Sequence, residues 1–228
     1  MTTAAEATPY SVLRAAILSL KLMPGEKLSE RGLESMLKAS RTPIRAALMS
    51  LANEGLTQRA GRGWQVTPID LAEVRAVMEY REALESASVR LAVERAEAEE
   101  LDALGDLARS HSDDEETVLR EGGDFHVALA RLSRNRFLAD GMSGALTRLS
   151  RTRWLEVQSA TSRAQAQDEH LAIIAAVTDR DAELAAERVV SHCRGTRERL
   201  LSHLDGERRR LRGRGFSIIE SSTAPQPL

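Results

Sequence analysis

The chain has few cysteines and few aromatic residues, and both shortages exclude classes of protein. Its single cysteine, Cys193, rules out an intramolecular disulfide framework and suits a reducing compartment. Aromatic residues make up 3% of the chain, which is too few for a platform that stacks the bases of single-stranded nucleic acid. The sequence also lacks an apolar run of transmembrane length and the charged-then-apolar order of a signal peptide. We therefore expect a cytoplasmic protein.

Charge is distributed unevenly along the 228 residues, whose formal net charge is −2. Residues 1–70 carry nine Lys and Arg against six Asp and Glu, whereas the rest carries 23 against 28. A mildly basic head followed by an acidic body is typical of one domain that contacts phosphate and another that does not. The length suggests one large domain or two modest domains, and it is sufficient for a hydrophobic core.

The clearest pattern in the sequence runs from Pro24 to Val66, with the letters PGEKLSERGLESMLKASRTPIRAALMSLANEGLTQRAGRGWQV. Ser29 is a suitable N-cap for a short helix, and Ser40 is a suitable N-cap for a second helix. Pro43 falls in the first turn of that second helix, where its missing N–H costs little. Four apolar residues at helical spacing predict its buried stripe: Ile44, Ala47, Leu48 and Leu51.

The second helix leaves Arg41, Thr42 and Arg45 on its exposed side, at its N-terminal end. A recognition helix presents this end to base edges in the major groove of DNA. Arginine pairs bidentately with guanine O6 and N7, and threonine contacts bases or phosphate. These three residues are therefore candidates for reading DNA.

A hairpin is expected directly after this helix. Gly55 is placed to end the helix, and residues 56–59 and 64–67 can pair as two short strands. Gly61-Arg62-Gly63 would form the tip, where glycine tolerates positive φ. Helix, turn, helix and hairpin in this order predict a winged helix-turn-helix that binds DNA.

The remainder of the chain shows no convincing strand alternation after Pro68. Apolar spacing predicts helices over 71–100, 101–111, 115–121, 124–133, 136–158, 166–178 and 181–204, with Gly122-Gly123 as a break. The expected fold is therefore mainly α, with an N-terminal winged helix-turn-helix followed by an all-α antiparallel helical bundle. The bundle core should include Ile173, Ile174, Val177, Leu184 and Val189.

The expected domain organisation follows from these elements. Residues 1–9 form a flexible N-terminus, 10–68 the DNA-binding domain, and 69–205 the helical effector-binding and dimerisation domain. Residues 206–228 change in composition from an arginine-rich run to a polar end, so we expect a mobile tail.

Three histidines lie on or beside apolar faces of three different predicted helices, namely His126, His170 and His192. Such histidines are often hydrogen-bonded core residues. Neutral imidazole is also the common ligand of zinc and nickel, and three of them leave a position open for a small molecule. The pattern alone leaves both interpretations open.

Residues 10–68 resemble the DNA-binding domain of the GntR family of bacterial transcription regulators, through PGEKLSERGLE, SRTPIRAALMSLANEGL and GRGWQV. The resemblance implies DNA contacts from six residues: Arg31, Arg41, Thr42, Arg45, Arg62 and Gly63. The chain departs from the family at Lys38-Ala39, where Gly-Val is usual, and at Ala46, where Glu is common. Neither departure falls on an implied DNA contact.

Residues 71–204 resemble the FCD effector domain of the FadR branch of that family, through VMEYREALESASVRLAVERA, FHVALARLSRN, EHLAIIAAV and the late His192. In metal-binding FCD domains the three histidines are ligands together with an Asp four residues before the first of them. Gly122 occupies that position here, and Asp124 precedes His126 by only two residues. The resemblance thus leaves three possibilities: a three-histidine site, a site that recruits Asp124, and a metal-free site.

Arg81 matches the arginine that the family places in the first long helix of the effector domain. A guanidinium facing a bundle cavity can clamp a carboxylate bidentately. The alternative interpretation is a surface ion pair with Glu85, four residues later on the same helix.

Together these patterns predict a homodimeric, ligand-responsive transcription regulator that is not an enzyme. We expect it to repress by binding a palindromic DNA operator, under control of a small carboxylate effector and with zinc or nickel assistance. One alternative is a metal-free regulator that senses an acyl or amino-acid ligand. A three-histidine metal-dependent hydrolase and a nucleoid protein without effector are alternatives of other classes.

Overall fold

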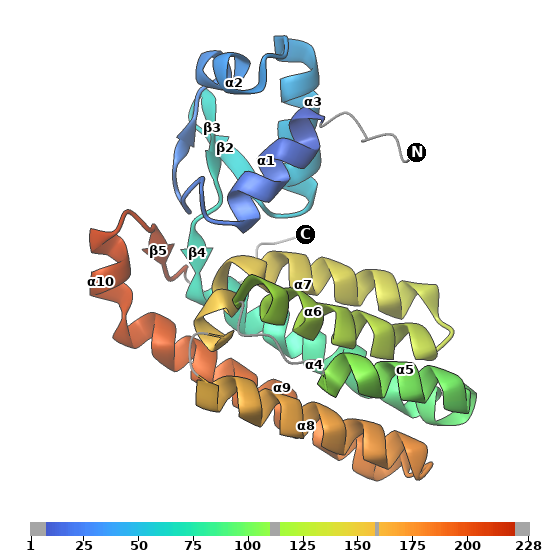
Figure 1. The fold of residues 1–228 in the computed structure, drawn as a ribbon. Coiled ribbons are helices and arrows are strands. Elements are labelled where there is room, and N and C mark those ends of the chain that lie inside the picture. The colour runs from blue at the N-terminus through green and yellow to red at the C-terminus, as the bar shows by residue number, and fades with distance from the viewer. Residues whose placement is uncertain (1–7, 110–114, 158–159, 222–228) are drawn as a thin grey trace. The chain divides into compact units, whose positions relative to one another are not determined.

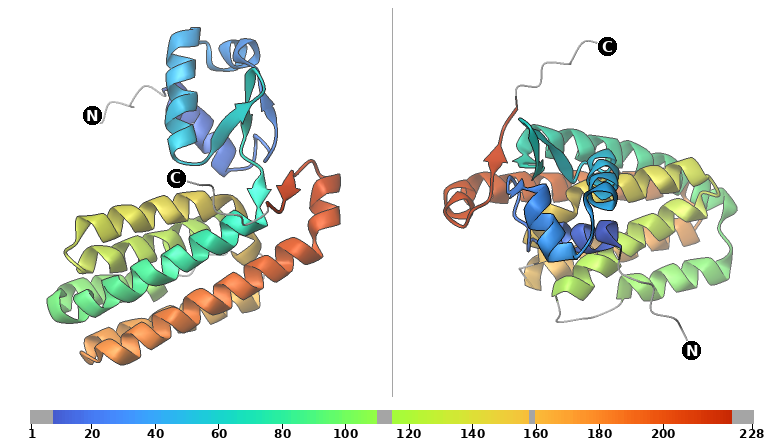
Figure 2. Two further views of the ribbon diagram at one scale, coloured as in Figure 1. Left: turned by 180° about the vertical axis from the view of Figure 1, so that it is seen from behind. Right: turned by 90° about the horizontal axis from the view of Figure 1, so that it is seen from above.

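The computed structural model of the protein describes residues 8–109, 115–157 and 160–221. The chain divides into two compact units (Figures 1 and 2). The N-terminal unit comprises the residues up to Ala72 together with those from Glu207 onward, and the helical unit comprises Glu73–Gly206. Each unit is described by itself.

The N-terminal unit contains three helices and a small sheet near the start of the chain (Figure 1). Its elements are α1 (Pro9–Leu18), β1 (Lys27–Leu28), α2 (Glu30–Leu37), α3 (Arg41–Asn53), β2 (Thr57–Ala60), β3 (Gly63–Val66) and β4 (Ile69–Asp70). Strands β1, β3 and β2 form an antiparallel sheet in that order. The predicted winged helix-turn-helix is therefore present. Of the expected flexible N-terminus, residues 1–7 lie outside the described residues, and Thr8 caps α1 at Pro9.

The turn between α2 and α3 follows the sequence expectation with two differences. The Ser29 hydroxyl accepts a hydrogen bond from the Gly32 amide at 3.1 Å, as expected of an N-cap. Ser40 occupies the N-cap position of α3, but its side chain makes no capping hydrogen bond. Lys38, where the family usually has glycine, takes the left-handed conformation with φ of 48°. The turn therefore keeps its geometry with a residue that pays a steric cost for positive φ.

The hairpin that follows α3 is present, but each strand lies one residue closer to the tip than expected, so Gly63 belongs to β3. Strands β2 and β3 pair with Thr57 opposite Val66 and Ala60 opposite Gly63, and Gly61 at the tip has φ of 58°. The predicted stripe of α3 is buried in one core cluster with Leu33, Trp64 and Val66. This core fixes α3 with its N-terminal polar residues outward.

The segment after Gly206 is not the mobile tail that the sequence suggested. It forms α10 (Arg208–Gly213) and β5 (Ile218–Ile219), and β5 pairs in parallel with β4. Three apolar residues of this segment are buried, namely Leu211, Phe216 and Ile218. Burial of apolar side chains and strand pairing thus order this segment, although its arginine content had indicated a solvated tail. Residues 222–228 of the expected tail lie outside the described residues.

The helical unit consists of α4 (Leu71–Arg95, which begins at the boundary), α5 (Ala98–Arg109), α6 (Glu115–Leu132), α7 (Arg136–Val157), α8 (Ala160–Thr178) and α9 (Ala182–Gly206). Helices α5, α6, α8 and α9 pack around a common core (Figure 2). Ile173, Ile174, Val177 and Val189 are buried there as predicted, and Leu184 is partly buried against them.

Three predicted helix boundaries in this unit are wrong. The helix expected to start at residue 166 begins at Ala160. The helix expected over 71–100 ends at Arg95, and α5 starts at Ala98. The break expected at Gly122-Gly123 is absent, because α6 continues through both glycines. A glycine lowers helix propensity by about 1 kcal/mol, which packing of the amphipathic face outweighs here.

Candidate nucleic-acid interface and candidate metal centre

The first turn of α3 exposes the side chains that the sequence singled out for DNA. Arg41, Thr42 and Arg45 are all exposed, and they lie at the helix end that a recognition helix presents to base edges. Arg31 is exposed on α2, and Arg62 and Gly63 are exposed at the hairpin tip. The candidate DNA contacts therefore come from α2, α3 and the hairpin of the same unit.

Two of these arginines form ion pairs with α2 that the sequence pattern did not indicate. Arg45 donates from Nε and Nη2 to the two carboxylate oxygens of Glu30, at 2.8 and 3.0 Å. Arg41 donates from Nε to Glu34 at 2.9 Å. The hydrogen bond from Arg45 lowers the pKa of Glu30 below its usual value, and the same bond raises the pKa of Arg45. The pairs hold both guanidinium groups across the turn between the two helices.

The hairpin carries one further arginine of interest, Arg59. Its guanidinium lies 4.1 Å from the ring centroid of Trp64, opposite it on the neighbouring strand. A cation over an indole face is attracted by the ring quadrupole. The sequence could have indicated this contact, because pairing of the two strands places Arg59 opposite Trp64.

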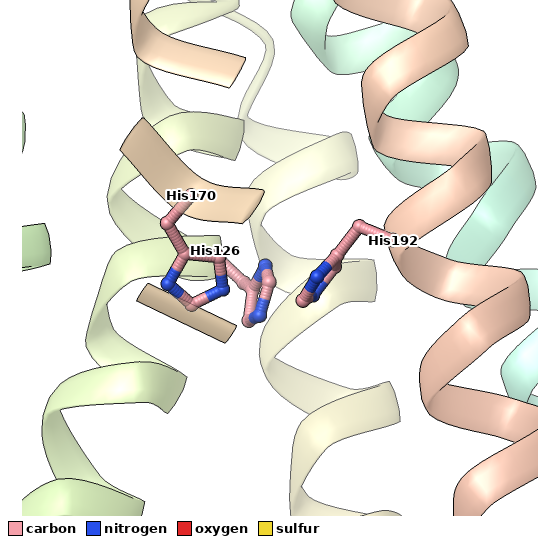
Figure 3. A group of neighbouring side chains, drawn as sticks. All are labelled: His126, His170 and His192. Atoms are coloured by element: carbon pink, nitrogen blue, oxygen red, sulfur yellow. The ribbon is translucent and has the colours of Figure 1, made fainter. Parts of the chain in front are cut away.

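The three candidate histidines of the helical unit converge in its interior, as Figure 3 shows. His126 comes from α6, His170 from α8 and His192 from α9. Each is buried, and one ring nitrogen of each lies within 4.8 Å of the others. Within the described residues, these three histidines form a group whose ring nitrogens could together ligate one metal ion.

Apolar packing brings these histidines together. Phe125 stacks on the His170 ring, with centroids 4.0 Å apart and an interplanar angle of 15°. The edge of His126 meets His170 at a centroid distance of 4.9 Å. Asp124, the provisional fourth ligand, is exposed and lies outside the group. The continuous helix α6 explains this, because residues two apart on a helix point in different directions.

Arg81 and Glu85 lie on α4, and both side chains are 1% exposed. Arg81 Nε donates to Glu85 Oε1 at 2.5 Å, so the ion pair that the sequence allowed on the surface is in fact buried. Burial alone would raise the pKa of Glu85, but the Arg81 guanidinium and His126 lower it below its usual range. The pair places one positive and one negative charge beside the histidines.

Two histidines are oriented by carboxylates that the sequence analysis did not assign to the site. His126 Nδ1 lies 3.1 Å from Glu85 Oε2, and His192 Nδ1 lies 2.7 Å from Glu169 Oε2. A carboxylate on one imidazole nitrogen fixes the ring and leaves the other nitrogen for a metal. The sequence did hold a signal, because Glu169 directly precedes His170 and Glu85 follows Arg81 by one helical turn.

The surroundings of His126 favour its neutral imidazole. Burial lowers the pKa of His126, and the nearby Arg81 lowers it further, against an opposing effect of Glu85. Neutral imidazole is the form that ligates metals. Three imidazole nitrogens, with a carboxylate hydrogen-bonded to Nδ1 of two of the rings, therefore fit a divalent ion such as zinc or nickel.

No helix of the described residues is both long and apolar enough to span a membrane.

Family models match both units. The model described as "Bacterial regulatory proteins, gntR family" matches residues 8–66, and the model described as "FCD domain" matches residues 76–195. The chain is 32% identical over 180 residues to the Nta operon transcriptional regulator of Aminobacter aminovorans, which covers 77% of this chain and 84% of that relative.

Two further comparisons agree with these matches. The HTH-type transcriptional repressor RspR of Escherichia coli strain K12 is 26% identical over 192 residues, with 80% of this chain and 83% of that relative covered. The solved structure of E. coli McbR/YncC superposes with a TM-score of 0.71 at 20% identity, covering 86% of this chain and 96% of that one. The structural likeness concerns the fold alone.

Proposed function

Since the chain belongs to the GntR family of bacterial transcription regulators and carries an FCD effector domain, we propose that it is a repressor that a small carboxylate releases from a palindromic operator. The family consists of regulators rather than enzymes, so the hydrolase interpretation is set aside. The observation that carries the proposal is the combination of an exposed arginine-bearing recognition helix with a buried cluster of three histidines and one arginine. Such a protein acts in the cytoplasm, where bacterial DNA lies.

The proposed DNA contacts are of two kinds: contacts with base edges, which read the sequence, and contacts with phosphate, which position the protein on the duplex. Arg41, Thr42 and Arg45 would face base edges from α3, because their side chains are exposed at the N-terminal end of that helix. Arg31 and Arg62 would contact phosphate. Gly63 would let the hairpin backbone approach the duplex closely, since it has no side chain.

A homodimer is part of this proposal, because one head offers few contacts and a palindromic operator matches a two-fold axis. The helical unit has an aromatic surface that suits a second copy of the chain. Tyr80 on α4 and Phe137 on α7 are 51% and 71% exposed. The Tyr80 hydroxyl lies against Gly141, one turn after Phe137, so the two aromatic residues share one surface. Exposed aromatic pairs of this kind are typical of interfaces.

The effector site would lie at the histidine cluster. A divalent ion held by His126, His170 and His192 would supply a Lewis acid there, and Arg81 would bind the anion. Gly122 lies in α6, one helical turn before His126, where metal-binding relatives carry the aspartate. We infer that the carboxylate of the effector takes the place of this missing ligand. A buried divalent charge without an anion is costly, and an effector carboxylate relieves that cost.

Repression rather than activation is supported by one named relative, the repressor RspR, although the identity to it is 26%. Effector binding would change the relative population of dimers that fit the operator. By linkage, an effector that lowers operator affinity must bind the DNA-bound dimer less tightly by the same factor.

The experiment that tests this function is a thermal-shift screen of small carboxylates on the purified full-length chain, with added zinc or nickel and with chelator. We expect stabilisation by at least one carboxylate in the presence of metal, and loss of that stabilisation in chelator or in His170→Ala. The same carboxylate should release the protein from an operator selected from random DNA. Failure of every carboxylate to stabilise or to release the protein would contradict the proposal.

A metal-free regulator is the second candidate, and a specific observation favours it. Gly122 stands where the related metal sites have their anionic ligand, and Arg81 already brings a positive charge into contact with His126. Carboxylate stabilisation that persists in chelator would select this candidate. Replacing Gly122 with Asp should tighten metal retention if the three histidines do hold an ion.

A further inference from the structure

One guanidinium nitrogen lies between two histidines of the cluster. Arg81 Nη2 is 2.7 Å from His126 Nε2 and 3.2 Å from His192 Nε2. Arg81 is 1% exposed, so this contact is made in the interior of the helical unit. Its Nε is held at the same time by Glu85.

The hydrogen positions at this contact follow from the partners. A guanidinium only donates hydrogen bonds, and a carboxylate only accepts them. His126 therefore donates from Nδ1 to Glu85 and accepts from Arg81 at Nε2. His192 likewise donates from Nδ1 to Glu169 and accepts from Arg81 at Nε2. Arg81 Nη2 lies beside both Nε2 atoms and is also 3.3 Å from His126 Nδ1. In this arrangement both rings carry a proton on Nδ1.

This is the state in which an imidazole ligates a metal ion. An ion bound by the cluster must lie between the ring nitrogens of the three histidines. One nitrogen of each ring lies within 4.8 Å of the other two. Arg81 Nη2 already lies in that space and donates toward the Nε2 atoms of His126 and His192. Each Nε2 has one lone pair, so it cannot accept a hydrogen bond from arginine and ligate an ion at once.

We propose that the Arg81 guanidinium and a divalent metal ion are alternative occupants of the histidine cluster. This inference rests on the metal assistance in the proposed function and deepens it. Metal loading breaks the two contacts of Arg81 Nη2 with His126 and His192. The released guanidinium group is then available to an effector carboxylate, which also offsets the added charge. Without metal, arginine itself holds the histidines in place.

The first test compares zinc affinities of the full-length protein, measured by competition with a chromophoric chelator. In Arg81→Met the competitor is gone, so zinc should bind at least about tenfold more tightly than in the wild type. The matched control is Arg199→Met, which removes a positive charge 3.6 Å from Glu169 but none between the imidazoles. If charge repulsion alone mattered, both variants would tighten zinc binding by similar factors.

The double variant Arg81→Met/Glu85→Gln keeps the test valid if the single variant fails to fold. It removes both members of the buried pair, and glutamine can still accept a hydrogen bond from His126 Nδ1. Zinc affinity of this variant should also exceed that of the wild type. Unchanged or weaker zinc binding in every folded Arg81 variant would overturn the proposal.

A second readout follows the Arg81 side chain itself in the wild-type protein. In protein labelled with nitrogen-15 arginine, the Arg81 side-chain N–H signal is identified by its loss in Arg81→Lys. Zinc titration should shift this signal in the wild type and leave it unchanged in His170→Ala. Zinc binding with an unchanged Arg81 signal would overturn the exchange but keep the metal-assisted function. Absence of zinc binding in the wild type and in every Arg81 variant would overturn both, whereas binding in the variants alone would support the exchange.

Discussion

Gly25 and Ser217 lie in direct contact, although 192 positions separate them in the sequence. A Cβ atom on Gly25 would come 2.3 Å from the Cβ atom of Ser217. The Ser217 amide donates to the carbonyl of Pro24 at 2.9 Å, and the Ile69 amide donates to the carbonyl of Ser217 at 2.9 Å. The C-terminal segment is therefore a structural part of the N-terminal unit.

The first prediction follows from this contact. Gly25→Ala should release β5 from the N-terminal unit, because the added methyl group collides with Ser217 and because Gly25 has φ of 87°. Hydrogen exchange of residues 208–221 should become faster. Gly61→Ala is the matched control, since Gly61 also has positive φ but has no atom within 4 Å of its added Cβ. Equal exchange in the two variants would contradict the role of the contact.

The second prediction concerns the recognition helix. Replacing Arg41 and Arg45 together with Ala should abolish preference for a selected operator over random DNA, because base-edge contacts carry sequence information. Arg62→Ala should instead weaken binding to both DNAs alike. Fluorescence anisotropy at one stated salt concentration measures the two affinities. A double variant that keeps its operator preference would assign the readout to other residues.

Glu30→Gln tests whether the ion pair with Glu30 holds the Arg45 guanidinium in the orientation that binds DNA. The pair is bidentate, at 2.8 and 3.0 Å, and lies between α2 and α3. Without it the guanidinium samples more orientations, so operator affinity should fall through a faster dissociation rate. Measured dissociation by surface plasmon resonance that equals the wild-type rate would exclude an orienting role for Glu30.

The dimer prediction uses the exposed aromatic surface of the helical unit. Tyr80→Glu/Phe137→Glu should shift the full-length protein from dimer to monomer in sedimentation velocity, because a carboxylate buried in an apolar interface is costly. Met49→Glu is the control, since Met49 is 59% exposed but lies on α3 in the other unit. A double variant that remains dimeric at micromolar concentration would place the interface elsewhere.

The histidine cluster predicts a pH dependence of stability for the metal-free protein. His126 has a lowered pKa in the folded state, whereas in the unfolded chain histidine titrates near about 6.5. Below that pH the unfolded state binds the proton and the folded state does not, so the free energy of unfolding falls as pH drops. One such group contributes a slope of up to about 1.4 kcal/mol per pH unit.

Chemical denaturation in chelator between pH 7 and 5 measures this slope. His126→Asn should flatten the curve, and the exposed His203→Asn should leave it unchanged. Glu85 acts in a different window: its lowered pKa adds stability that is lost only as pH falls below the ordinary carboxyl range. A wild-type curve that is flat from pH 7 to 5 would contradict the lowered pKa of His126, because it means that the folded and unfolded states bind equal numbers of protons.

Several elements of the fold have causes that lie within a few residues, and the sequence predicts these elements correctly. The Ser29 cap, the buried stripe of α3 from Ile44 to Leu51 and the hairpin with Gly61 at its tip all follow from spacing and backbone preference over a few residues. The three histidines were likewise predicted to face inward from three helices, because each neighbours apolar residues at helical spacing.

The contacts between residues that are distant in the sequence depend on how the helices and strands pack. Glu85 and Glu169 reach His126 and His192 from other helices, and Arg81 enters the cluster because the side chains of α4 and α6 meet there. The arginine-rich end is ordered because Leu211 and Ile218 are buried and because β5 pairs with β4. Spacing along one helix cannot encode these partners, since their distances depend on how separate elements pack to bury apolar surface.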